Sequence, residues 1–348
     1  MNNEEPQLQP RHHHVNELDE GKKKSMKSRI IVGVILAVVA IPAVFLGGWF
    51  YFALISFFFF FATYEFIHAP RKKYPWYIWV VTYIVTTSYL YWAFAKSNIS
   101  AYKADPQNFV FSLEDHFDEP SVSWYTLIGS LGIYFAVSIL NKDFDFFDVC
   151  YLFAMSFLVG LGFQCLLFMR YHPIQQGLIH YGDFANGNGY RFLASSTLLF
   201  FVVICAFGND IMAYFVGVFF GKHKMSPRVS PNKSWEGFFG GWILGGLLAL
   251  GFAMIIEATG KPVIPSLPIF GPDSKWYAVV FLSFTLPLIG VIGDLTFSLV
   301  KRHFGIKDYS RLLAAHGGVL DRVDSLLFCS VFASSFIVVF EKGGGFFA

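Results

Sequence analysis

The chain has 348 residues, of which 55% are hydrophobic and only 14% are charged, and its formal net charge is +2. Soluble domains carry about 25% charged residues, so this composition excludes a pair of ordinary soluble domains and indicates an integral membrane protein. We therefore expect a lipid bilayer around the chain and no nucleic-acid partner.

Residues 1–28 differ from the rest of the chain because they are polar and basic, and we predict a disordered cytosolic tail there. Residues 29–348 are predicted to form a single membrane-embedded domain. The first apolar run starts near Ile30 and further apolar runs follow it, so we expect no cleavable signal sequence.

A helix needs about 20 mostly apolar residues to cross the hydrocarbon of a bilayer. The candidate spans are 30–46, 48–67, 75–95, 124–140, 148–169, 192–220, 237–257, 277–300 and 323–340. The predicted fold class is therefore all-α, a polytopic bundle of about nine transmembrane helices. The first two spans are expected to form a tight hairpin around Gly47-Gly48. Asn209-Asp210 predicts a break or bend in the long sixth span.

The distribution of basic residues indicates the orientation of these spans. If the N-terminus is cytosolic, 19 of the 26 Lys and Arg residues fall on the cytosolic side. Because positive charge is enriched in cytosolic loops, we predict a cytosolic N-terminus. Asn209-Asp210 and the loops 221–236 and 301–324 then lie at or near the cytosolic face. Polar groups placed in this way are candidates for a functional site.

The eighth span carries ionisable side chains toward one end. Asp294 and Ser298 share a helix face because they are four residues apart, and Lys301 and Arg302 continue that face toward the interface. A carboxylate in an apolar span needs a partner. A divalent cation and a hydrogen bond within the bundle explain Asp294 equally well.

A second polar group lies in "HGGVLDRVD", residues 316–324. Gly317-Gly318 allows the backbone to approach a ligand closely, and Asp321 and Asp324 share one face of the following helix. Carboxylates mixed with basic residues suit a polyphosphate with hard metal ions. The alternatives are aspartates that only stabilise a helix N-terminus and a basic loop on anionic lipid. The lipid alternative does not explain the aspartates.

The third polar group is "GKHKMSPRVSPNKSWEGFFGG", residues 221–241. Ser230, Lys233 and Ser234 offer hydroxyls and an ammonium group. Ser234 is expected to open the seventh helix, whose free N–H groups would meet a phosphate. The glycines at 237, 241 and 245 form a pattern that is typical of close helix packing.

Together these motifs resemble the signature of the phosphatidate cytidylyltransferases, also called CDP-diacylglycerol synthases. The resemblance rests on the spacing of 298–302, 307–308 and 316–324, and the stretches 204–224 and 230–241 are similar to the family in its eukaryotic form. The match covers about 200–341. It implies that CTP and phosphatidic acid give CDP-diacylglycerol and pyrophosphate. By motif position, it also implies metal ligands at Asp294 and Asp321.

From the residues and the resemblance together, we expect Asp294 and Asp321 to hold Mg²⁺, and we leave a second, monovalent cation open. The expected catalytic residues are Lys301, Arg302, Lys307, His316 and Asp324. The expected substrate-binding residues are Asn209, Asp210, Ser230, Lys233, Ser234, Ser298, Gly317, Gly318 and Arg322. Glu65 is a weaker candidate, for which snorkelling to the interface is the preferred explanation. The resemblance also favours the endoplasmic reticulum membrane and is compatible with a homodimer.

Two other functions compete with this interpretation. One is a CTP-dependent membrane enzyme related to polyprenol or phytol kinases, which would use an alcohol as acceptor. The other is a transporter or scaffold without catalysis. The Lys-Arg, Lys-Asp and His-Gly-Gly run favours the phosphatidate enzyme, and the presence of every expected functional group argues against a non-catalytic protein.

Overall fold

The computed structural model describes residues 20–111, 120–173, 190–260, 262–264, 266–310, 312 and 317–342. The described chain is almost entirely helical, which confirms the predicted all-α class. The helices are α1 (Glu20–Leu46), α2 (Gly48–His68), α3 (Trp76–Ala104), α4 (Trp124–Leu140), α5 (Phe146–Pro173), α6 (Tyr190–Val203), α7 (Asn209–Phe220), α8 (Trp235–Ala258), α9 (Trp276–His303) and α10 (Leu320–Lys342). Strands β1 (Lys224–Ser226) and β2 (Ser230–Ser234) pair antiparallel between α7 and α8.

In the described part of the chain, seven helical segments are long and apolar enough to cross a membrane. They are Gly48–His68, Trp76–Ala104, Phe146–Pro173, Ser196–Phe220, Trp235–Ala258, Trp276–His303 and Leu320–Glu341. Gly33–Leu46 and Trp124–Leu140 are also apolar but shorter. These nine segments correspond to the nine predicted spans. Among the long ones α5 is the most buried, and α2, α3, α4, α6 and α10 pack around it.

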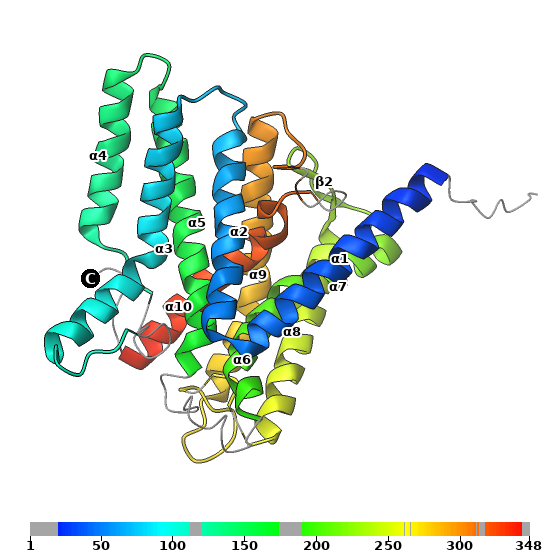
Figure 1. The fold of residues 1–348 in the computed structure, drawn as a ribbon. Helices are drawn as coiled ribbons and strands as arrows, with labels where there is room; N and C mark the ends of the chain where they lie inside the picture. Colours follow the sequence, from blue (N-terminus) through cyan, green and yellow to red (C-terminus); the bar gives the residue numbers. More distant parts are fainter. Residues whose placement is uncertain are drawn as a thin grey trace, which may run out of the picture.

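The first two helices meet at a sharp turn, as predicted. Gly47 and Gly48 both have positive φ angles, 66° and 48°, and glycine adopts this backbone conformation without the steric cost of a Cβ atom. Helix α1 leaves the turn at a wide angle to α2 (Figure 1).

The sixth span is interrupted, as its Asn209-Asp210 pair predicted. A π-helical turn, Ile204–Gly208, separates α6 from α7. Such turns occur frequently at functional sites, and this one ends directly before Asn209. The start of α7 also lies very close to α8. A Cβ atom added at Gly241 would lie 2.8 Å from the Asn209 carbonyl oxygen, and one at Gly245 would lie 2.9 Å from the Asn209 Cα. The glycine pattern therefore serves close packing.

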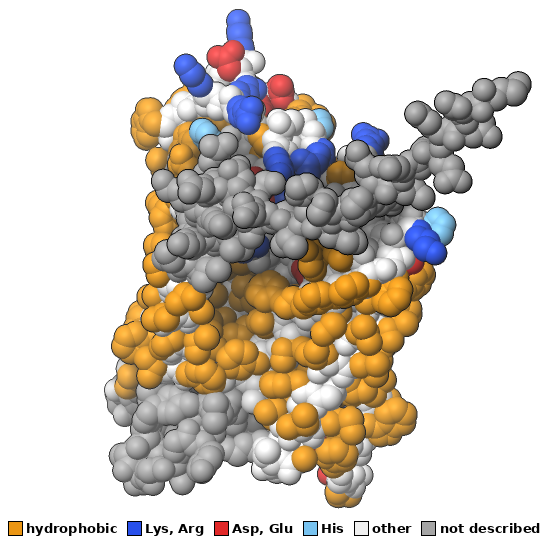
Figure 2. Space-filling view, turned by 90° about the vertical axis from the view of Figure 1, so that its right-hand side faces the viewer, with side chains coloured by type: hydrophobic (Ala, Val, Ile, Leu, Met, Phe, Trp, Pro, Cys, Tyr) orange, Lys and Arg blue, Asp and Glu red, His pale blue; other side chains and the backbone are white. Residues whose placement is uncertain are grey.

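The three polar groups of the sequence lie at one end of the bundle. This end holds the connection between α2 and α3, the β1–β2 hairpin and the segment between α9 and α10 (Figure 1). Lys, Arg, Asp and Glu side chains gather there, whereas the body below is covered by hydrophobic side chains (Figure 2). We call this the polar end.

Candidate active site

A cavity of about 500 Å³ lies between α7, α8, α9 and the β1–β2 hairpin. Its polar lining includes Asn209, Asp210, Asn232, Lys233, Ser234 and Asp294. Five of these six residues were predicted site residues, and they come from three separate segments of the chain. The structure therefore brings the sixth span, the loop 221–236 and the eighth span together around one space. This space is the candidate active site, and we call it the catalytic cavity.

Lys233 on β2 and Asp294 on α9 form an ion pair in the catalytic cavity. Their side chains are 25% and 24% exposed, so a molecule entering the cavity can reach both. Ser298 donates a hydrogen bond from Oγ to Asp294 Oδ1 at 3.2 Å, which confirms the predicted shared helix face. We call Lys233–Asp294 the open pair.

Ser234 opens helix α8, as predicted. Its Oγ accepts a hydrogen bond from the Gly237 N–H at 3.1 Å, which is the usual N-cap contact. The hydroxyl thus satisfies one of the N–H groups that a phosphate was expected to meet, and the same residue lines the catalytic cavity.

Two further carboxylates lie near the open pair. Asp210 on α7 and Asp324 on α10 are close enough to Asp294 for their charges to interact. The Ser325 Oγ lies 3.5 Å from Asp210 Oδ2 and 3.4 Å from Asp324 Oδ1. The Asn209 Oδ1 is buried and has no hydrogen-bond partner among the described residues.

Carboxylate and amide oxygens are the ligands that Mg²⁺ prefers, so the donor chemistry around Asp294 fits such an ion. Within the described part of the chain, no three His, Cys, Asp or Glu side chains are already grouped as a metal site.

Asp321 lies in a different setting, at the start of α10. Its Oδ1 is 2.7 Å from the Lys301 Nζ, and the two side chains are only 7% and 9% exposed. Its Oδ2 accepts hydrogen bonds from the backbone N–H groups of Tyr309 at 2.9 Å and Gly318 at 3.0 Å. We call Lys301–Asp321 the closed pair, because every oxygen of the carboxylate already has a donor.

The Tyr309 ring completes the surroundings of the closed pair. The Lys301 Nζ lies 5.7 Å from the centre of this ring, a cation–π contact. Burial raises the pKa of the Tyr309 hydroxyl well above its ordinary value. The hydroxyl therefore stays protonated and donates to the Phe297 carbonyl at 3.3 Å, which ties the segment after α9 back onto α9.

Glu65 of α2 holds the other side of this segment. Its side chain accepts hydrogen bonds from the Ser310 Oγ at 2.5 Å and from the N–H groups of Val319 and Leu320 at 2.8 Å each. The residue is 1% exposed. The preferred explanation for Glu65, snorkelling to the interface, is therefore wrong: this carboxylate points inward and caps the N-terminus of α10.

The glycine pair is explained by these contacts. Gly317 has a φ of 81°, a conformation that favours glycine. A Cβ atom added at Gly318 would lie 2.6 Å from a Glu65 carboxylate oxygen. The pair thus lets the backbone approach Glu65 and Asp321 closely.

Other predicted residues lie away from the catalytic cavity. Arg302 donates from Nε to the Val229 carbonyl at 3.2 Å and from Nη1 to the Ile306 carbonyl at 3.1 Å. Lys307 and Arg322 are exposed. Ser230 begins β2 and does not line the cavity. His316 lies outside the described residues.

The sequence is similar to a known protein family and to named bacterial enzymes. A family model described as the cytidylyltransferase family matches residues 27–340. A phosphatidate cytidylyltransferase of Haemophilus influenzae is 32% identical over 313 residues, which cover 89% of this chain and 98% of that protein. The enzyme of the same name from Pseudomonas aeruginosa is 41% identical over 168 residues, 48% of this chain and 52% of that protein. Both relatives are bacterial, so the expected eukaryotic form of the resemblance is not borne out.

Proposed function

This chain belongs to the cytidylyltransferase family, and we propose that it acts as a phosphatidate cytidylyltransferase, which forms CDP-diacylglycerol and pyrophosphate from CTP and phosphatidic acid. The observation that carries this proposal is the catalytic cavity, where an accessible lysine and two carboxylates, Asp210 and Asp294, meet at the polar end of membrane helices. A soluble nucleotide can enter there from the aqueous side, and a lipid can enter between helices.

The reaction requires neutralisation of the negative charge on the phosphates more than it requires a strong base. The phosphate of phosphatidic acid is already an anion near neutral pH, and one of its oxygens attacks the α-phosphorus of CTP. The bond to the β-phosphate then breaks and pyrophosphate leaves. Lys233 would neutralise phosphate oxygens in the cavity, as lysine does at other phosphate sites.

The proposal includes Mg²⁺ held by Asp294 and Asp321, with Asp210 and Asp324 near Asp294. A bound Mg²⁺ would offset the charge of the phosphates and of the leaving pyrophosphate. In the present arrangement, lysine ammonium groups lie beside both proposed ligands. The carboxylates that surround Asp294 and the unpaired Asn209 oxygen support Asp294 most directly.

The purified chain tests the reaction with CTP labelled either on the α- or on the γ-phosphate. Phosphatidic acid and a polyprenol are offered as alternative acceptors with Mg²⁺. We expect the α-label to enter phosphatidic acid and the γ-label to leave with pyrophosphate. Transfer of the γ-label to the alcohol would identify a kinase instead and would overturn the proposal.

We further propose that the polar end faces the cytosol, which the distribution of Lys and Arg supports. Single cysteines at 226 and 310 should react with an impermeant thiol reagent only from the cytosolic side, and cysteines at 110 and 268 only from the opposite side. The exposed Cys150 is first replaced by serine. Reversed labelling would place the polar end on the wrong side for CTP. The endoplasmic reticulum and the homodimer stay predictions from the resemblance.

A further inference from the structure

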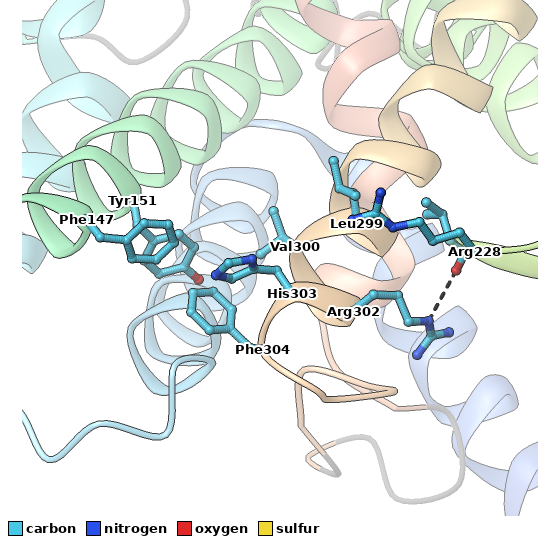
Figure 3. Close-up of a pocket in the computed structure, with 9 residues that line it drawn as sticks. Phe147, Tyr151, Arg228, Leu299, Val300, Arg302, His303 and Phe304 are labelled. Carbon is cyan, nitrogen blue, oxygen red and sulfur yellow. Dashed lines mark hydrogen bonds between the residues drawn. The ribbon is translucent and has the colours of Figure 1, made fainter.

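A second cavity, of about 360 Å³, lies at the polar end and is lined by a different set of residues. They are Phe147, Tyr151, Arg228, Val229, Leu299, Val300, Arg302, His303 and Phe304 (Figure 3). His303 follows Asp294 by nine residues, so at about 3.6 residues per turn it lies on the opposite side of α9. We call this the lateral cavity, because α9 separates it from the catalytic cavity.

One side of the lateral cavity is basic. Arg228 extends from the β1–β2 hairpin toward Leu299 (Figure 3). The Arg302 guanidinium is held by the Val229 and Ile306 carbonyls. Arg302 has further N–H donors beyond these two bonds. In the described part of the chain, neither arginine forms an ion pair with a carboxylate. The two guanidinium groups therefore offer positive charge to an anion from outside the protein.

The other side of the lateral cavity is apolar and aromatic. Phe147 stacks on His303 with ring centres 5.0 Å apart, and Tyr151 meets Phe304 edge to face at 4.8 Å. Phe147 and Leu299 are about half exposed, so the apolar wall continues onto the outer surface of the bundle. Because α5 begins and α9 ends here, the lateral cavity lies at the boundary between the hydrophobic body and the polar end.

A ligand that fits both sides has an anionic head and an apolar tail. We propose that the lateral cavity binds the phosphate group of an acidic phospholipid that is not itself a substrate. Arg228 and Arg302 contact the phosphate, because guanidinium groups bind phosphate oxygens through paired N–H donors. The acyl chains lie along Leu299 and Phe147. This site goes beyond the proposed reaction, since α9 separates it from the open pair.

Native mass spectrometry of the whole detergent-solubilised chain tests the proposal. Phosphatidylglycerol is titrated as the acidic lipid and phosphatidylcholine as the zwitterionic control. Wild-type protein should hold one tightly bound phosphatidylglycerol in excess over phosphatidylcholine. Arg228→Gln should weaken that binding by about tenfold, the loss expected for one or two charged hydrogen bonds. Leu299→Trp, which fills the cavity and keeps both arginines, should weaken it similarly.

Lys222→Gln is the matched control, because it removes a positive charge from the neighbouring loop without touching the lateral cavity. It should change the affinity by less than about twofold. Equal phosphatidylglycerol binding in wild type, Arg228→Gln and Leu299→Trp would overturn the site. Competition by inorganic phosphate as strong as that by phosphatidylglycerol would show a site for soluble phosphate and would overturn the lipid assignment. Both results are independent of the CTP reaction.

Discussion

The open and closed pairs have the same chemistry, a lysine beside an aspartate, but different surroundings. Lys233–Asp294 is about one quarter exposed and lines a cavity, whereas Lys301–Asp321 is buried and its carboxylate also accepts two backbone N–H groups. An ion pair whose members can be reached can exchange its partner for a ligand. A buried pair with every oxygen satisfied fixes the backbone around it. The comparison therefore supports the proposed substrate contact at the open pair. It also shows that the closed pair fixes the backbone of the segment after α9, a structural role that Asp321 has in addition to the metal contact proposed for it.

The largest expected effect is on turnover, in Asp294→Asn. Losing this carboxylate should lower the rate of CDP-diacylglycerol formation by at least about 100-fold, the loss typical of a group that stabilises transition-state charge. The melting temperature in detergent should change little, because the pair is partly exposed and such pairs contribute little stability. Thr296→Val, which replaces a polar side chain two residues away on α9 by an apolar one of similar shape, is the control and should keep its activity. An Asp294→Asn variant with near-normal turnover at saturating Mg²⁺ would remove this residue from the site.

Asp321→Asn should reduce both turnover and stability, which distinguishes it from Asp294→Asn. Removing one member of a buried ion pair costs about 3–5 kcal/mol because the other charge stays buried. We therefore expect a clearly lower melting temperature, measured by thermal unfolding in detergent, together with lost activity. A variant that loses activity at an unchanged melting temperature would show that the closed pair acts like the open one.

Glu65→Gln tests the contacts that hold the segment between α9 and α10 against α2. The amide keeps the volume of the carboxylate, but its NH₂ group would face at least one of the N–H donors that Glu65 now accepts. The expected loss is about 1.5–3 kcal/mol of stability. The segment that Glu65 holds contains no residue of the open pair, where CTP is proposed to bind. We therefore expect kcat to decrease more than the affinity for CTP. Glu65→Asp, which keeps the charge but shortens the reach, should lose less than Glu65→Gln if charge is the important property.

Much of the fold follows from the sequence, because apolar runs of sufficient length have few alternatives in a bilayer. The nine spans and the interruption before Asn209 were predictable in this way. The sequence predicted that Lys233 and Asp294 lie at the same end of the bundle, but not that they touch, since the packing of α8 on α9 decides which side chains meet. Glu65 was misjudged because its partners lie 245–255 residues further along the chain. No local pattern indicates such a contact.

Arg302 shows that the sequence also fails to predict which site a residue joins when two candidates are adjacent in the chain. Its place next to Lys301 predicted a common role, yet successive residues on a helix point about 100° apart. Lys301 turns to the closed pair and Arg302 to the lateral cavity.

The smallest effect is expected from exchanging these two neighbours, Lys301→Arg with Arg302→Lys, which leaves the total charge unchanged. At position 301 the buried site must accept a guanidinium group, which is larger than the lysine ammonium. At position 302 a single ammonium replaces the planar guanidinium that now donates to two carbonyls. We expect kcat/KM for CTP to fall by about tenfold at a similar protein level. An unaltered kcat/KM would indicate that only the total charge of this segment matters.

Equilibrium binding of CTP, with and without Mg²⁺, tests the central claim that CTP and its metal meet at the open pair. Labelled CTP is titrated into folded wild-type, Asp294→Asn and Thr296→Val proteins in the absence of phosphatidic acid, so that no turnover occurs. We predict that Mg²⁺ strengthens CTP binding in the wild type and in Thr296→Val, and that Asp294→Asn loses this dependence. If Mg²⁺ strengthens CTP binding equally in all three proteins, the metal binds elsewhere and the account of the open pair is contradicted.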